Sequence, residues 1–306
     1  MEPADDGDDR LSLGGKTPQR TQGALANIQR AFFLSRRTGD GASFAAMFAH
    51  PLSFDILRRV FAFEFVDHLL RYLFLAGGAF LFFRVRRWRW APKIQPETPA
   101  ARELRREILY SLASLAIFAL TGVGVYVMMQ LGWARLYFHI APRGWGYLAL
   151  STGALILAHD TWFYWTHRLM HTRALFPLFH RVHHLSRNPT PWAAFAFHPL
   201  EAVVEAGIFP LIVLVLPLHP LAALTWLLYM TVMNVLGHCG FEILPRGFVR
   251  HWLFRWHNTS THHDMHHRFV RCNYGLYYNV WDRLMGTNHE RYEDEFERVK
   301  AGASGR

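Results

Sequence analysis

The chain has 306 residues, of which 51% are hydrophobic and 15% aromatic, and its formal net charge at pH 7 is +10. This composition fits one membrane domain better than two soluble domains. The arginines lie beside apolar segments without a nucleic-acid motif, so the charge indicates a basic collar at a membrane surface rather than a nucleic-acid-binding protein. The two cysteines, Cys239 and Cys272, are too few for a disulfide framework, and we expect both to pack as small side chains.

The N-terminal region shows no catalytic motif. Residues 1–22 are acidic, glycine-rich and poor in apolar side chains, which predicts a disordered tail. No basic stretch followed by an apolar one opens the chain, so we expect no cleaved signal peptide. Residues 23–60 mix apolar side chains with arginines, a pattern typical of amphipathic helices at a membrane interface.

Membrane spans are predicted from residue 61 onward. Residues 61–83 form the first, and the basic loop 84–93 that follows should lie in the cytoplasm, because basic loops favour that side. Residues 109–131 carry no charge and are long enough to cross a hydrocarbon core of about 30 Å. Residues 145–165 then return to the cytoplasm.

The apolar run 202–236 is too long for one crossing and contains Pro217 and Pro220 near its middle. A helical hairpin that turns at these prolines gives two spans, residues 200–216 and 221–240. Together the segments predict an all-α fold, an integral membrane helical bundle of about four spans. The polar, basic and aromatic residues from 241 onward should form a helical cytoplasmic cap.

Three histidine boxes follow the ends of predicted spans on the cytoplasmic side. The first has two histidines at i, i+4 spacing, and the others share the pattern H-x-x-H-H. Their members are His167 and His171, then His180, His183 and His184, then His263, His266 and His267. Residues three and four apart share a helix face, so each box should turn its ring nitrogens toward one point.

Eight imidazoles exceed what one ion can bind, because a structural zinc site usually closes with four ligands. The boxes therefore predict a site for two metal ions. Imidazole suits zinc, copper, iron and nickel, so the ligands do not choose the metal. Two alternatives remain: a metal transporter, which would place ligands within spans along a path, and a membrane zinc hydrolase, which would use fewer ligands and a general-base carboxylate.

Boxes of the form H-R-x-x-H, H-x-x-H-H and H-x-x-H-H between membrane spans resemble those of the fatty acid hydroxylase and sterol desaturase superfamily. His159-Asp160 before the first box and Asn273-Tyr274-Gly275 after the third support the resemblance, which covers roughly residues 109–287. The run from Thr190 to Glu201, with its T-P-x-A-x-x-A-F-H-P pattern, is most similar to the sterol C-5 desaturase branch.

The resemblance implies an enzyme, a di-iron oxidoreductase that uses O₂ to hydroxylate or desaturate an unactivated C–H position of a membrane lipid, sterol-like or fatty acyl. It implies two iron ions as cofactors. Electrons would come from a separate donor, a ferredoxin or a cytochrome with an NAD(P)H reductase, because the chain has no flavin, nicotinamide, iron–sulfur or haem motif.

The predicted spans, the basic loop and the resemblance together predict a location and a domain organisation. The catalytic domain would occupy residues 61–298, and residues 299–306 would be a loose tail. The protein would be a multi-pass protein of a bacterial inner membrane or of the endoplasmic reticulum, with its metal site on the cytoplasmic side.

Further site residues are expected around the boxes, with no catalytic residue beyond the metal centre. By resemblance, His238 is a ninth ligand and Glu242 accepts a hydrogen bond from it. His159 lies about two turns deeper than His167, so helix geometry argues against it as a ligand. Candidates that orient ligands or line the substrate pocket are His159, Asp160, His198, Glu201, Glu205, Asn234, Asp264 and Asp282. Among these acids Asp264 is the best placed by sequence.

The predicted topology can be tested with reporter tags. Tags inserted after Arg89 and after Lys300 should both report the cytoplasm, and a tag between Leu136 and Arg143 should report the opposite side. Protease protection of each tag in sealed vesicles gives the answer. A C-terminal tag on the outer side would contradict the prediction, because the three boxes could then not meet.

Overall fold

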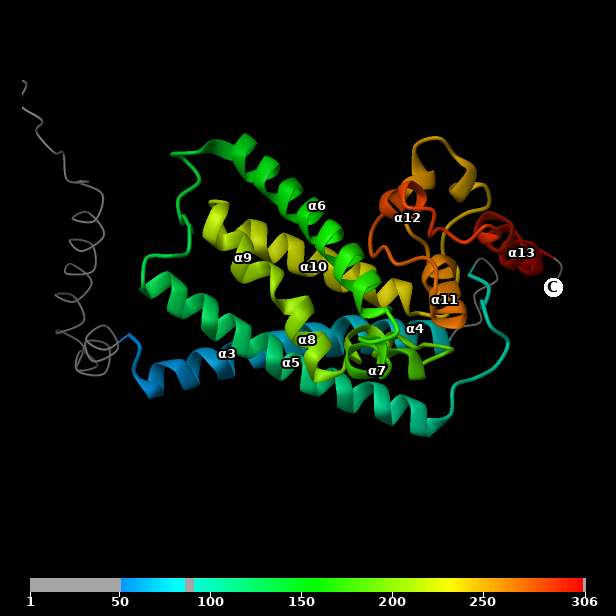
Figure 1. Cartoon of the computed structure of the whole chain (residues 1–306), viewed down its shortest axis with the longest axis horizontal. Coiled ribbons are helices and arrows are strands. Elements are labelled where there is room, and N and C mark those ends of the chain that lie inside the picture. Colours follow the sequence, from blue (N-terminus) through cyan, green and yellow to red (C-terminus); the bar gives the residue numbers. More distant parts are fainter. Residues whose placement is uncertain (1–50, 86–90, 305–306) are drawn as a thin grey trace, which may run out of the picture. The chain divides into compact units, whose positions relative to one another are not determined.

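The computed structural model describes residues 51–85 and 91–304, and the regular elements in these ranges are all helices (Figure 1). Within the same ranges only isolated β-bridges occur, and no strand. The all-α prediction is therefore confirmed. The expected tail of residues 1–22, most of the interfacial segment 23–60 and part of the basic loop 84–93 lie outside the described residues.

The helices differ widely in length. The long ones are α3 (Phe54–Tyr72), which continues through the π-helical turn η1 (Leu73–Gly77) into α4 (Gly78–Val85), then α5 (Ala101–Gln130), α6 (Gly144–Met170) and α10 (Pro220–Gly237). The short ones are α7 (Phe176–Phe179), η2 (His183–Leu185), η3 (Pro191–Phe195), α8 (Pro199–Ala206), α9 (Ile208–Val215), η4 (Phe248–Arg250), η5 (Phe254–Trp256), α11 (Ser260–Phe269), α12 (Val280–Leu284) and α13 (Tyr292–Ser304). Residues 299–304, expected to be part of a loose tail, continue α13.

Three helical segments are long and apolar enough to cross a membrane, judged by length and composition among the described residues. They are Phe54–Phe83, Ala101–Gln130 and Pro220–Gly237. The first begins seven residues before the predicted span at 61, because α3, η1 and α4 form one continuous run.

The predicted break at Pro217 and Pro220 is confirmed. α9 ends at Val215 and α10 begins at Pro220, where a proline fits because the first helical N–H has no partner in any case. His219 caps the new helix, since its Nδ1 accepts a hydrogen bond from the N–H of Leu221 at 3.1 Å. His219 is thus the turn residue of the hairpin.

The segment 200–216, expected to be one span, is instead two short helices separated at Gly207. Pro210 accounts for the break. Its nitrogen carries no hydrogen to donate to the carbonyl of Ala206, and its ring crowds that carbonyl. The helix is therefore interrupted between α8 and α9.

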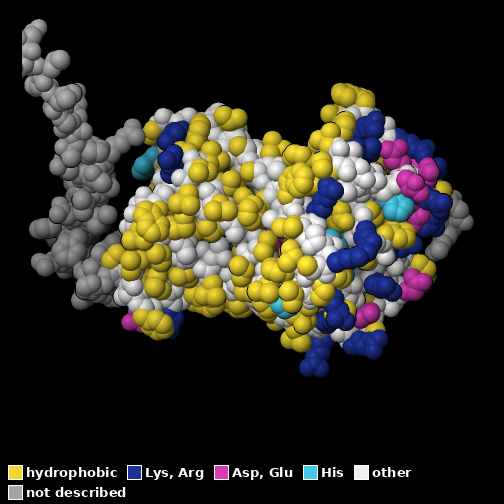
Figure 2. Space-filling model, viewed as in Figure 1, with side chains coloured by type: hydrophobic (Ala, Val, Ile, Leu, Met, Phe, Trp, Pro, Cys, Tyr) yellow, Lys and Arg dark blue, Asp and Glu magenta, His cyan; other side chains and the backbone are white. Residues whose placement is uncertain are grey.

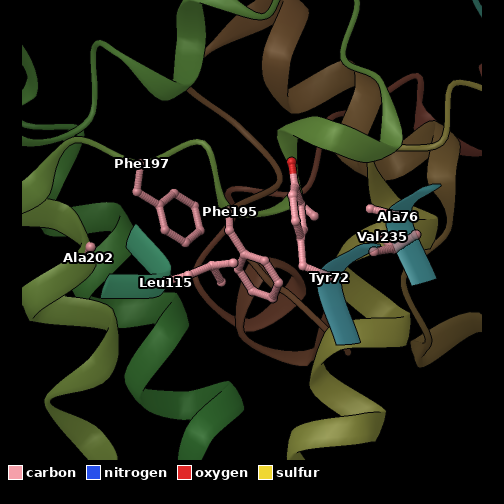
Figure 3. Close-up of a cluster of buried hydrophobic side chains, with 8 residues drawn as sticks. Tyr72, Ala76, Leu115, Phe195, Phe197, Ala202 and Val235 are labelled. Atoms are coloured by element: carbon pink, nitrogen blue, oxygen red, sulfur yellow. The ribbon is translucent and has the colours of Figure 1, made fainter. Parts of the chain in front are cut away.

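One hydrophobic core fixes the loop between the second histidine box and α8. Tyr72, Leu115, Phe195 and Phe197 are among the buried side chains at its centre (Figure 3). The Tyr72 hydroxyl donates a 2.9 Å hydrogen bond to the carbonyl of Trp192, so the loop is held by polar as well as apolar contacts. This core holds the loop residues Ala194, Phe195 and Phe197 against Leu115 of α5.

The surface divides into apolar and charged regions. Figure 2 shows hydrophobic side chains over the long helices and most of the charged side chains near α11, α12 and α13. Leu120 and Leu150 are 60% and 70% exposed on α5 and α6, which suits contact with lipid tails.

Replacement of Leu115 by Ala should lower the midpoint of thermal unfolding in detergent. The side chain is 1% exposed, and a buried Leu→Ala change costs about 2 to 5 kcal/mol through lost contacts and the cavity left behind. Leu120→Ala on the same helix is the matched control and should change the midpoint little. Equal losses in both variants would contradict the packing described for α5.

Candidate metal centre

Five histidines form a first group whose ligand nitrogens lie within 4.8 Å of one another. Its members are His167, His171, His180, His184 and His266. They come from the end of α6, the segment that follows α7, η2 and α11. The Nε2 atom of His167 is 2.8 Å from that of His180, and the Nε2 of His171 is 3.2 Å from that of His184.

Four histidines form a second group with the same spread of 4.8 Å. Its members are His183, His238, His263 and His267, and all are buried. His238 stands directly after α10, where its Nε2 lies 2.9 Å from that of His263 and 3.2 Å from that of His183. The structure therefore brings together all nine histidines expected as ligands.

The two H-x-x-H-H boxes are interleaved. In the second box His180 and His184 enter the first group while His183 enters the second, and in the third box His263 and His267 enter the second group while His266 enters the first. The expectation that each box points toward one place holds for the first box, because His167 and His171 both enter the first group. It is wrong for the two H-x-x-H-H boxes, because in each of them the i, i+4 pair and the middle histidine face different sides. These two boxes thus contribute to both groups, which makes the groups neighbours.

The hydrogen bonds of the Nδ1 atoms show that the converging Nε2 atoms of the same rings carry lone pairs. Backbone carbonyls accept hydrogen bonds from Nδ1 of three rings: Tyr274 for His167 at 2.8 Å, Cys272 for His266 at 2.6 Å and Asn234 for His238 at 2.7 Å. A carbonyl cannot donate, so each Nδ1 holds the proton and each neutral ring leaves Nε2 bare.

Bare nitrogens that face each other need a cation between them. His167 and His180 both use Nδ1 for hydrogen bonds, yet their Nε2 atoms approach to 2.8 Å. The Nε2 of His266 is buried and has no hydrogen-bond partner among the described residues. A metal ion would satisfy these atoms, since neutral imidazole is a common metal ligand.

Burial keeps the box histidines uncharged. Desolvation, followed by the neighbouring imidazoles, lowers the pKa of His184 to about 3. The same causes lower the pKa of His180, His183, His263, His266 and His267 well below the ordinary value. These rings are therefore neutral at pH 7, which is the form that binds metal.

Glu201 contacts a histidine of the first group directly. Its Oε1 lies 2.6 Å from Nδ1 of His180, and both side chains are buried. α8 begins at Pro199, so the carboxylate stands in the first helical turn. Glu201 thus orients the His180 ring, as expected for an acid next to a ligand.

Two other acids do not have their expected partners. Glu242 accepts hydrogen bonds from the N–H and hydroxyl of Thr261 at 2.9 and 2.7 Å, and so holds the start of α11. It does not receive the Nδ1–H of His238, because that group donates to the carbonyl of Asn234 at 2.7 Å, which also accepts the backbone N–H of His238.

Asp264 also faces away from the groups. Its Oδ1 accepts a 2.7 Å hydrogen bond from Gln95, and its Oδ2 is 3.9 Å from Arg268. Burial raises its pKa to about 6. It therefore ties α11 to the segment before α5 rather than orienting a ligand.

Asp160 and Asp282 act on the loop that follows the third box. Asp160 accepts the N–H of Tyr277 at 2.8 Å, and Asp282 accepts the N–H groups of Tyr274 and Gly275 at 2.8 and 2.7 Å. A Cβ at position 275 would lie 2.4 Å from the carbonyl of Tyr278, so only glycine fits there. The two acids thus hold in place the carbonyl that anchors His167.

Several expected residues lie outside both groups. The Nδ1 of His159 is 2.9 Å from the hydroxyl of Tyr277. His198 caps α8 by accepting the N–H of Leu200, and the amide of Asn234 donates to the carbonyl of Ala194 at 2.6 Å. Sequence reasoning missed the carbonyl anchors, because any residue type can supply one.

Two cavities lie near the groups. A groove of about 580 Å³ runs over the outer face of α6 and is lined mainly by apolar side chains such as Leu157, Trp162 and Leu169, but by none of the nine histidines. A smaller cavity of about 60 Å³ lies between the end of α10 and the start of α11, and His263 of the second group lines it. The smaller cavity gives a guest molecule direct contact with a histidine group.

Comparison with known proteins agrees with the histidine pattern. Residues 152–287 match the family described as Fatty acid hydroxylase. Curated relatives include lathosterol oxidases of Mus musculus and Rattus norvegicus, 31% and 32% identical over 187 residues, which cover 60% of this chain and 61% of each relative. A Delta(7)-sterol 5(6)-desaturase of Gibberella zeae is 31% identical over 61% of this chain and 56% of its own length. The resemblance inferred from the boxes, including its sterol C-5 desaturase branch, is confirmed.

These matches cover less than two thirds of the relatives' lengths. No solved structure matches the chain.

Glu201→Gln should weaken metal binding about 10- to 100-fold, because the amide no longer fixes and polarises the His180 ring as a carboxylate does. Glu205→Gln is the control. Glu205 is also buried, one turn along α8, but has no hydrogen bond to a histidine among the described residues. Metal retained after titration with a chelator gives the affinities. Equal loss of metal in both variants would show that Glu201 has no specific role in metal binding.

Proposed function

We propose that this chain, whose residues 152–287 match the fatty acid hydroxylase family, is an O₂-dependent di-iron membrane oxidoreductase that oxidises a C–H position of a sterol-like lipid. The observation that carries the proposal is the pair of neighbouring, all-histidine groups with bare nitrogens turned inward. The printed names of the relatives, lathosterol oxidase and Delta(7)-sterol 5(6)-desaturase, support the choice of lipid and reaction.

The two groups fit two iron ions. His167, His171, His180, His184 and His266 would hold one ion, and His183, His238, His263 and His267 the other. Two irons with nitrogen ligands would activate O₂, and activated O₂ is needed to attack an unactivated C–H bond.

The residues of the chain provide the surroundings for this chemistry. Carbonyl groups and Glu201 fix the ring orientations, so the ligand nitrogens converge without rearrangement. Tyr164 and Tyr277 are fully buried near α6 and help to exclude water from the site. The apolar surface of the long helices suits contact with membrane lipid (Figure 2).

We further propose that the catalytic domain spans residues 61–298 and that the metal groups face the cytoplasm. A separate electron donor, a ferredoxin or a cytochrome with its reductase, would dock there. The exposed arginines near the boxes, among them Arg173, Arg181 and Arg271, suit an acidic carrier.

The alternatives fit the site less well. A zinc hydrolase needs a carboxylate as general base, but neither group contains a carboxylate among the described residues. A transporter would distribute ligands along the spans, whereas these nine side chains gather within two small groups.

The function can be tested with the full chain in vesicles, loaded with iron and supplied with O₂, a reductase and a mixture of sterols and fatty acyl lipids. We expect one sterol to gain an oxygen or lose two hydrogens. His167→Ala should reduce this product at least about 100-fold, because the first group then lacks a ligand. His139→Ala, in an exposed loop, is the matched control and should retain activity. Oxidation of fatty acyl lipids only would contradict the sterol assignment.

A further inference from the structure

The cavity of about 60 Å³ beside His263 has a mixed lining. Its apolar wall comes from Met233 and Leu236 on α10, from Ile243 and Leu244 after that helix, and from Leu276. The α10 side chains are partly exposed, so the cavity lies close to the surface of the segment that can cross a membrane. An apolar guest could thus reach the second histidine group from the lipid side.

Asn258 is the polar side chain of this lining that is free to bind a guest. It is 5% exposed, and neither its amide nitrogen nor its amide oxygen has a hydrogen-bond partner among the described residues. Neighbouring polar groups are engaged: the Ser260 hydroxyl donates to the carbonyl of Leu236, and the Thr259 hydroxyl accepts the N–H of His262.

The backbone of Asn258 is fixed while its side chain is not paired. Its N–H donates to the carbonyl of Tyr277 at 2.9 Å, and its carbonyl accepts Nδ1 of His257 at 2.8 Å. A buried amide without a partner is unfavourable, and such groups are few in folded proteins and often have a functional role. The buried amide is therefore available to a partner that is not part of the chain.

We propose that the Asn258 amide binds an oxygen of the lipid substrate, a ring hydroxyl only a few bonds away from the carbon that is oxidised. The cavity has room for about four or five water-sized groups, so a guest that reaches both Asn258 and His263 must carry its oxygen close to the reacting carbon. A sterol-like ring alcohol meets this condition. A mid-chain position of a fatty acyl lipid lies too far from its polar head.

This inference rests on the proposed function and assigns to Asn258 the recognition of the substrate oxygen. The test uses the full chain, purified in detergent and loaded with metal, with two probes that share one ring system: cholestanol, which has a ring hydroxyl, and cholestane, which has none. Displacement of radiolabelled cholestanol by each unlabelled probe gives both affinities without any need for turnover.

We expect the wild-type protein to bind cholestanol about 5- to 10-fold more tightly than cholestane, because one net hydrogen bond increases the affinity by about this factor. Asn258→Leu, which keeps the branched shape of Asn without its polar atoms, should abolish this preference and leave the affinity for cholestane unchanged. Asn188→Leu is the matched control, since that amide donates to the carbonyl of Glu97 at the surface, and the preference should remain.

Metal content and thermal stability separate recognition from a structural role. The Asn258 side chain makes no hydrogen bond within the described residues, so Asn258→Leu should retain both metal ions and an unchanged or higher unfolding midpoint. Asn258→Ala, which cannot clash, should lose the preference in the same way if the Leu variant does not fold.

Equal binding of the two probes by the wild type, binding of neither, or a preference that survives both substitutions at Asn258 would overturn the inference. The proposed function fails separately. If the iron-loaded protein oxidises no lipid while the preference depends on Asn258, the recognition stands and the reaction does not. If sterol oxidation is observed while the preference does not depend on Asn258, the proposed function is supported and the role of Asn258 in recognition is refuted.

Discussion

The structure depends on the mutual approach of unprotonated ring nitrogens in a buried site. Carbonyl groups accept hydrogen bonds from the Nδ1–H groups of His167, His266 and His238, so the Nε2 atoms of these neutral rings carry no proton. Without cations this arrangement would be repulsive, and with them it is a preformed binding site. Metal binding should therefore contribute to the stability of the folded chain as well as to its chemistry.

Helix ends provide the positions for this site. His167 and His238 stand at the C-terminal ends of α6 and α10, where the last carbonyls have no partner within the helix. The carbonyl of Asn234, in the last turn of α10, accepts both the backbone N–H and the Nδ1–H of His238, and so fixes the His238 ring. The loop from Tyr274 to Tyr278 supplies another anchor and is itself held by Asp160 and Asp282. Helices α6 and α10 and the loop after α11 therefore depend on each other through the histidines.

The sequence predicted the all-α fold and the break at Pro217 and Pro220, because apolar length and proline act locally. It missed the break at Gly207, although Pro210 was a signal for it. The histidine spacing identified which side chains gather but not how the boxes interleave, since His183 and His184 are neighbours in sequence that enter different groups. Partners of the ligands were least predictable. Glu242 and Asp264 are near the boxes in sequence but contact Thr261 and Gln95, and the carbonyl anchors have no residue signature.

Metal stoichiometry tests the central claim, that the interleaved boxes form two separate binding groups. The purified chain would be loaded with ferrous iron without oxygen, freed of excess metal and analysed for iron per polypeptide. The account predicts two ions in the wild type and one in His263→Ala/His267→Ala, which removes half of the second group and leaves the first complete. A single ion in the wild type, or an unchanged pair in the double variant, would contradict it.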